Sequence, residues 1–150
     1  MNNLFNPKDA ASILARLENL SEKANRQWGK MNVNQMLAHC NASLDTALGK
    51  HKPKSLGFAL RLLGKLLKKS YFGDKPFPKN STTDKDYIIK GNPDFELEKA
   101  KLIQGIKAFS EGGPDKCNKN DHAFFGPLQP IEWAVMQWKH LDHHLRQFGA

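Results

Sequence analysis

The chain has 150 residues, a formal net charge of +8 and 25 % charged residues. This length and composition are typical of one soluble globular domain over residues 1–150, and they exclude a disordered chain. No run of 18 apolar residues occurs, and the first ten residues lack the basic and apolar segments of a signal peptide, so we expect a cytoplasmic protein without a membrane span. The two cysteines form no CxxC motif, and we expect free thiols.

Four amphipathic segments with helix-starting signals divide the chain. Asn-Pro pairs begin the first and third segments, because the Asn side chain can cap a helix whose first position is proline. Strand signals are scarce, so the sequence predicts an all-α antiparallel four-helix bundle. The expected helices start at Asn6, Asn32, Asn92 and Pro130, and they end near Leu20, Gly49, Gly112 and Gly149.

Residues 50–79 contain nine basic residues and one acidic residue, whereas the rest of the chain is neutral. An anionic partner would therefore meet the protein at this basic segment. A nucleic-acid partner is disfavoured, because no groove-reading or single-strand motif accompanies the basic residues.

A short amphipathic helix is expected inside the basic segment, from Ser55 to about Lys69, as an extra crossover helix. Its leucines fall on one side and its basic residues mostly elsewhere. This pattern is typical of a helix on a membrane surface, and equally of a crossover that covers the bundle and turns its lysines to water. We favour the second interpretation, because Pro53 and the turn-rich residues 73–78 bracket the helix like an ordinary connection.

Three of the six histidines lie within five positions of the last expected helix. His140 and His144 are four residues apart, so they differ by about 40° around the helix and lie on one face. One helix can present two imidazoles to one metal ion with this spacing. The alternative is a polar pair near a helix C-terminus, where the helix dipole favours histidine. His143 is turned further toward solvent, and we expect it at the surface.

A metal site would need a third ligand from another helix. His39 is the only histidine of the second expected helix and borders the apolar side of that helix. The alternative for His39 is an isolated histidine bonded to a carbonyl group. His51 and His122 lie in expected loops and are poorer ligands, although His122 could line the site.

Further residues are expected around this site. Trp133 and Met136 share the helical face of His140, so we expect them to line the same partly apolar pocket, which would suit a small organic substrate. Cys40 is turned about 100° around its helix from the preceding histidine, toward the apolar side. We therefore expect a buried, inert thiol at Cys40 and not a nucleophile. Helical phase places no carboxylate well for a general base.

Three stretches of the sequence resemble a known family over essentially the whole chain. They are "WGKMNVNQMLAH" at residues 28–39, "FPKNSTT" at 77–83 and "HAFFGPLQPIEWAVMQWKHLDHHLRQFG" at 122–149. Together they resemble the DUF1569 branch of the DinB/YfiT-like metalloenzymes, and the last stretch is the most specific. The resemblance implies a four-helix bundle with a three-histidine metal site, to which His39 contributes one ligand and His140 and His144 two.

The resemblance also implies a function. A divalent ion, Zn or Ni or a similar metal, would serve an enzyme that acts on a small molecule, as a hydrolase or as a transferase using a low-molecular-weight thiol. Because the ligands must be neutral, metal affinity should fall as the pH drops through about 6.5. The alternative is a non-catalytic helical module that binds an anionic surface or partner through residues 50–79. Whether the chain forms a homodimer is left open.

Overall fold

The computed structural model describes residues 1–54, 56–73 and 75–150. Within these ranges the regular structure is helical, and the only strand-like contact is an isolated bridge between His122 and Gly126. The predicted all-α class is confirmed. The helices are α1 Pro7–Glu18, α2 Val33–Ala47, α3 Phe58–Tyr71, α4 Phe95–Gly112 and α5 Pro130–Gln147, with short 3-10 turns η1 Lys85–Tyr87 and η2 Gly113–Lys116.

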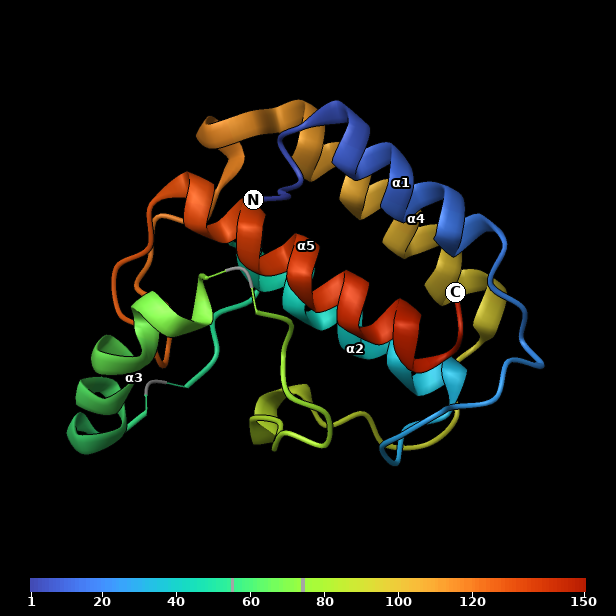
Figure 1. The fold of residues 1–150 in the computed structure, drawn as a ribbon, viewed down its shortest axis with the longest axis horizontal. Coiled ribbons are helices and arrows are strands. Elements are labelled where there is room, and N and C mark those ends of the chain that lie inside the picture. The colour runs from blue at the N-terminus through green and yellow to red at the C-terminus, as the bar shows by residue number, and fades with distance from the viewer. Residues whose placement is uncertain (55, 74) are drawn as a thin grey trace.

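Four of the helices form the predicted bundle, in which α1 and α2 each pack against both α4 and α5. Figure 1 shows that α1 and α5 run in one direction and α2 and α4 in the other. Because α2 and α4 are parallel, the chain must return along the bundle between them. Residues 48–94 make this return and contain α3 and η1.

Side-chain caps begin α1, α2 and α4, with one difference from the prediction. The Asn6 side chain accepts from the Lys8 N–H, and Asn32 forms a capping box at the start of α2. The prediction that Asn92 caps the third bundle helix is wrong. Asp94 caps α4 instead, and the side-chain Oδ1 of Asn92 accepts a hydrogen bond from the Asn32 side-chain amide at 2.9 Å. The Asn92 side chain is therefore used to join the starts of two neighbouring helices.

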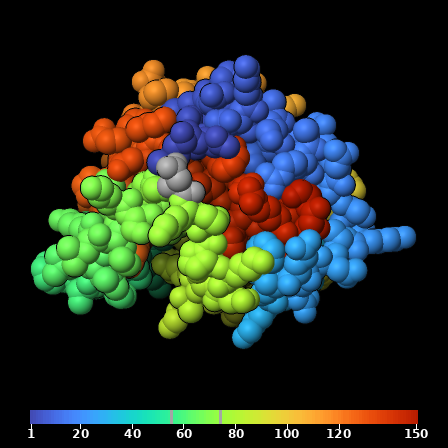
Figure 2. Space-filling view, viewed as in Figure 1, coloured from blue at the N-terminus to red at the C-terminus, as the bar shows by residue number. Residues whose placement is uncertain are grey.

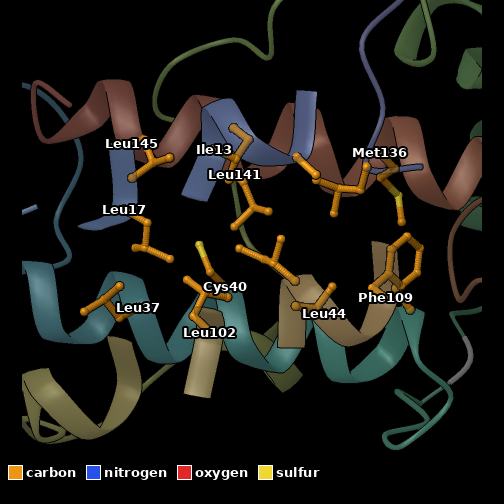
Figure 3. Packing of buried hydrophobic residues seen from close by; sticks show 14 of the residues in the cluster. Ile13, Leu17, Leu37, Cys40, Leu44, Leu102, Phe109, Met136, Leu141 and Leu145 are labelled. Atoms are coloured by element: carbon orange, nitrogen blue, oxygen red, sulfur yellow. The ribbon is translucent and has the colours of Figure 1, made fainter. Parts of the chain in front are cut away.

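The core lies between the two layers of the bundle. In Figure 3, side chains from α1 and α5 meet those from α2 and α4 across the interior. Leu37 and Phe109 are fully buried there. Complete burial of one such side chain stabilises the fold by about 1.5–3 kcal/mol. The labelled members are Ile13, Leu17, Leu37, Cys40, Leu44, Leu102, Phe109, Met136, Leu141 and Leu145.

Both cysteines are free, as predicted, and both are buried, although burial was predicted for Cys40 alone. Cys40 is 1 % exposed, its Sγ lies 3.7 Å from the Met36 sulfur, and burial raises the pKa of its thiol. Burial also raises the pKa of Cys117, to about 11. At neutral pH both side chains are therefore protonated thiols.

The orientation of α3 corrects the favoured interpretation of the basic segment. α3 begins at Phe58, and the expected start at Ser55 lies outside the described residues. The helix turns its leucines outward, while Arg61 and Lys68 form ion pairs with Asp121 and Glu132 of the bundle side. Among the described helices, none has the length and apolar character needed to cross a membrane.

Candidate metal centre

His39 lies in α2, beneath the turn η1. Its side chain is buried, and its Nδ1 lies 3.0 Å from the carbonyl oxygen of Tyr87. A carbonyl oxygen can only accept, so Nδ1 carries the hydrogen and donates it. The lone pair of the neutral ring is therefore on Nε2, which points toward α5. A hydrogen-bond acceptor behind the ring, on the side away from the ligand nitrogen, is how proteins orient metal-binding histidines.

His144 in α5 is oriented by a comparable chain of hydrogen bonds. Gln147 donates its amide N–H to the Trp28 carbonyl oxygen at 2.7 Å, which fixes the orientation of the amide group. The Gln147 Oε1 is then left to accept from Nδ1 of His144 at 2.8 Å. His144 is 7 % exposed. Its lone pair is on Nε2, as in His39, and is available to a ligand.

His140 completes the group from one turn earlier in α5. Its Nε2 lies 2.9 Å from the Nε2 of His39. Two nitrogen lone pairs cannot face each other at this distance, so either a proton or a cation must lie between them. The Nδ1 of His140 is buried and has no hydrogen-bond partner among the described residues. No acceptor among the described residues therefore fixes a proton on Nδ1, the tautomer that metal binding through Nε2 would require.

The three histidines form a compact set of donors that fits a divalent ion. One ring nitrogen from each lies within 4.8 Å of the others, and the ring centroids are 4.6–4.9 Å apart. Tetrahedral zinc with bonds of about 2.0–2.1 Å would place its nitrogen ligands roughly 3.3 Å apart. The His39–His140 nitrogen distance of 2.9 Å is shorter than this value, and the largest separation in the group, up to 4.8 Å, is longer. Small side-chain rotations would therefore bring the three nitrogens to the spacing that zinc requires.

Burial keeps all three histidines neutral. Desolvation is the main cause that lowers the pKa of His39, and it lowers that of His144 to about 3. The pKa of His140 lies well below its usual value because of burial and of the neighbouring histidines. Neutral imidazole is the form that binds a metal ion. The group is therefore ready to bind a metal at neutral pH, without first losing protons.

The sequence of this chain matches a family model described as a protein of unknown function, DUF1569, over residues 4–150. The chain belongs to the DUF1569 family. No curated protein and no solved structure matches it. In this member of the family, three histidines gather between α2 and α5.

The remaining histidines of this DUF1569 protein lie outside the group. His143 is half-buried, not at the open surface as expected, because Trp28 and Phe77 cover its ring at centroid distances of 5.5 and 6.2 Å. His51 is exposed near η1. His122 accepts two backbone N–H groups on its Nδ1, at 3.1 and 3.2 Å, and burial lowers its pKa to about 4. That nitrogen is therefore not available to a metal.

The residues expected to line a pocket are buried in the bundle. Trp133 is 1 % exposed, and its ring lies 5.4 Å from that of His122. Met136 is 6 % exposed and points toward Phe109 in the core (Figure 3). Helical phase assigns both to the face of His140, and their role as pocket lining stays a prediction.

The carboxylates near the site in sequence are bound elsewhere. Asp142 contacts Arg16 at 2.7 Å and Arg146 at 2.9 Å, and Asp45 contacts Lys101 at 3.0 Å. In the described ranges, the only group of histidine, cysteine and carboxylate side chains close enough to hold a metal is the three histidines. The donor set is therefore purely imidazole, as expected.

Sequence reasoning did not identify the partners of the outer nitrogens. The acceptor for His39 is the main-chain carbonyl of Tyr87, and a main-chain group cannot be recognised from the identity of the residue. Gln147 could have been found, because it lies three residues after His144 and therefore on the same helical face. Trp28 acts through its carbonyl group as well, and it lies in one of the stretches that carry the family resemblance.

Proposed function

We propose that this DUF1569 protein is a metal-dependent enzyme of the DinB/YfiT-like type. His39, His140 and His144 would hold a divalent ion, Zn or Ni being favoured by the imidazole ligands. The substrate would be a small molecule, and the reaction a hydrolysis or a transfer from a low-molecular-weight thiol. One observation carries the proposal, namely that three neutral histidines converge within 4.8 Å while two of them are oriented by carbonyl acceptors behind them.

The number of ligands favours a catalytic ion over a structural one. Three protein ligands leave a coordination position for water or substrate, whereas structural sites are closed by four. When bound, the ion would supply Lewis acidity that favours the deprotonated form of a water molecule or thiol. The chain's own residues would orient the ligands, through Tyr87 for His39 and through Gln147 for His144.

The expected substrate pocket follows the same face of α5. Trp133 and Met136 precede His140 by about two turns and one turn, and His122 contacts the Trp133 ring. Apolar walls with few polar groups suit a small organic molecule. No carboxylate joins the three histidines within the described part of the chain, so the proposal assigns no general acid or base.

Elemental analysis of protein purified without added metal tests the proposal first. The wild type should contain about one divalent ion per chain, and His39→Ala should contain little, while His143→Ala should resemble the wild type. The metal-loaded protein is then incubated with a low-molecular-weight thiol and an electrophilic acceptor, and with hydrolysable esters and amides. Metal binding without turnover in any of these assays would favour the non-catalytic alternative.

A further inference from the structure

Helix α3 presents an uncovered apolar face. Phe58 is 84 % exposed and Leu66 is 74 % exposed, whereas apolar side chains of the bundle helices are mostly buried. On a helical projection the exposed apolar residues span about half of the circumference. No other described helix or 3-10 turn packs closely against α3. The outward face consists of Phe58, Ala59, Leu60, Leu62, Leu63, Leu66 and Leu67.

The polar side of α3 holds the helix in this orientation. Arg61 Nη2 lies 2.7 Å from Asp121, and Lys68 Nζ lies 2.9 Å from Glu132 and 3.0 Å from the Pro127 carbonyl oxygen. Midway between them Gly64 is buried against the backbone of Phe124, where a Cβ atom would overlap the carbonyl oxygen. These contacts place the polar side against the protein, and the apolar side faces out as a result. Figure 2 shows the helix (green) as a projection at one edge of the molecule.

Positive charge borders the outward face. Lys65 and Lys69 are exposed at its edge, and neither has an acidic partner among the described residues. They belong to the basic segment, residues 50–79, which holds the whole net charge of the chain. A second copy of this chain seated on the same face would bring the lysines of both copies together, which is unfavourable. The charge therefore favours an anionic occupant.

We propose that the outward face of α3 docks the protein on an anionic lipid bilayer, with its leucines in the boundary between headgroups and acyl chains. A 14-residue helix is about 21 Å long, too short to cross the hydrocarbon core, so it lies in the plane of the surface. The apolar side chains would insert into the interface, and the lysines would be attracted to the anionic headgroups. Stable membrane binding of a peripheral protein requires both contributions. The docking surface lies on the crossover and does not use the histidine centre.

Flotation of the full chain with vesicles tests this proposal. Wild-type protein should float with vesicles of phosphatidylcholine and phosphatidylserine and remain unbound with phosphatidylcholine alone. The double variant Leu62→Gln/Leu66→Gln should lose binding by at least about tenfold, because two insertion contacts become polar. Leu97→Gln is the matched control, since Leu97 is 66 % exposed on α4 and away from the outward face. Far-ultraviolet circular dichroism should be the same for all these proteins.

A charge variant and a depth probe complete the test. Lys65→Glu/Lys69→Glu should weaken binding by at least about tenfold, whereas Lys107→Glu on α4 should not. Phe58→Trp should show a blue-shifted emission with anionic vesicles. Absence of vesicle binding would overturn the proposal, and so would binding that survives Leu62→Gln/Leu66→Gln. A wild-type dimer in sedimentation that becomes monomeric in this variant, without vesicle binding, would assign the face to a second copy.

Discussion

Helices α5 and α3 are both amphipathic, but the structure uses their faces in opposite ways. In α5 the border between the polar and apolar faces is turned inward, and His140 and His144 are enclosed there with His39. In α3 the polar side is turned inward through Arg61 and Lys68, and the apolar face points away from the protein.

The difference teaches what an amphipathic pattern leaves undetermined. Periodicity reveals that a helix has two faces, and it does not reveal which face the rest of the protein covers. The decision depends on partners that are distant in sequence. Asp121 and Glu132 accept the basic side chains of α3, and the Tyr87 carbonyl accepts the His39 ring. Each variant below tests one side of this comparison.

The largest expected effect is a cavity in the bundle core. Leu37 is fully buried, so Leu37→Ala should lower the free energy of unfolding by about 2–5 kcal/mol. Leu66→Ala removes the same atoms from the outward face of α3 and should change it by less than about 0.5 kcal/mol. Urea denaturation measures both. Equal losses would mean that α3 is covered by something in solution.

The second effect concerns pH and the metal-free protein. The pKa of His144 is lowered to about 3 by burial, and those of His39 and His140 are lowered too, while in the unfolded chain all three titrate near about 6.5. As the pH falls below about 6.5, the unfolded state takes up protons first. The contribution of these histidines to stability should therefore be constant above this pH and decline below it, until the folded protein is protonated as well.

The expected decline in the free energy of unfolding at acidic pH can be given a size and tested with a variant. Each histidine that is protonated only in the unfolded state lowers the free energy of unfolding by up to about 1.4 kcal/mol per pH unit. His144→Gln removes one of these contributions, so its stability should depend less steeply on pH between about 6 and 4. A wild-type stability that increases as the pH falls through this range would contradict the burial of neutral histidines. If the three histidines hold a metal ion, the same burial should move the acid loss of metal affinity below the value near about 6.5 expected from sequence.

The third effect concerns the hydrogen bond by which Gln147 orients the ring of His144. Gln147→Leu removes the acceptor of the His144 Nδ1 hydrogen while keeping similar bulk. Loss of such an outer partner should reduce metal affinity about 10–100-fold. Gln104→Leu, at an exposed position of α4, is the control and should leave affinity unchanged. If both variants bind alike, Gln147 does not position His144.

The smallest effect concerns the ion pairs that hold α3. Lys68→Ala removes a partly exposed pair and should lower the free energy of unfolding by only about 0.2–1 kcal/mol. The helix itself should become easier to open, so chymotrypsin should cleave near Phe58 faster than in the wild type. Lys107→Ala provides the reference. Unchanged cleavage would mean that other contacts orient α3.

The bundle was predictable from sequence because its signals are local. Asn6 and Asn32 cap the helices that short-range chemistry predicts them to cap. The same pattern predicts a cap at Asn92, but the structure gives that role to Asp94, two residues later. Both residue types are good caps, and the choice depends on the contact between Asn92 and Asn32, which no local pattern contains.

The three candidate ligands were predictable from the sequence, but the hydrogen-bond acceptors that orient their rings were not. The spacing of His140 and His144 places them on one helical face, and the position of His39 as the only histidine of its helix, beside that helix's apolar side, made it the candidate third ligand, which the family resemblance then supported. The carbonyl groups that orient the rings come from Tyr87 and, through Gln147, from Trp28. Main-chain acceptors are set by how a loop crosses a helix, so they become visible only in three dimensions.

Calorimetric titration of Zn and Ni into single variants tests the central claim most directly. The wild type should bind one ion per chain, and His39→Ala, His140→Ala and His144→Ala should each lose most of the affinity. His143→Ala should bind nearly as the wild type does, because His143 lies outside the group and contacts Trp28 instead. If His143→Ala is the damaging variant, or if none of the four changes binding, the three histidines do not form the metal centre.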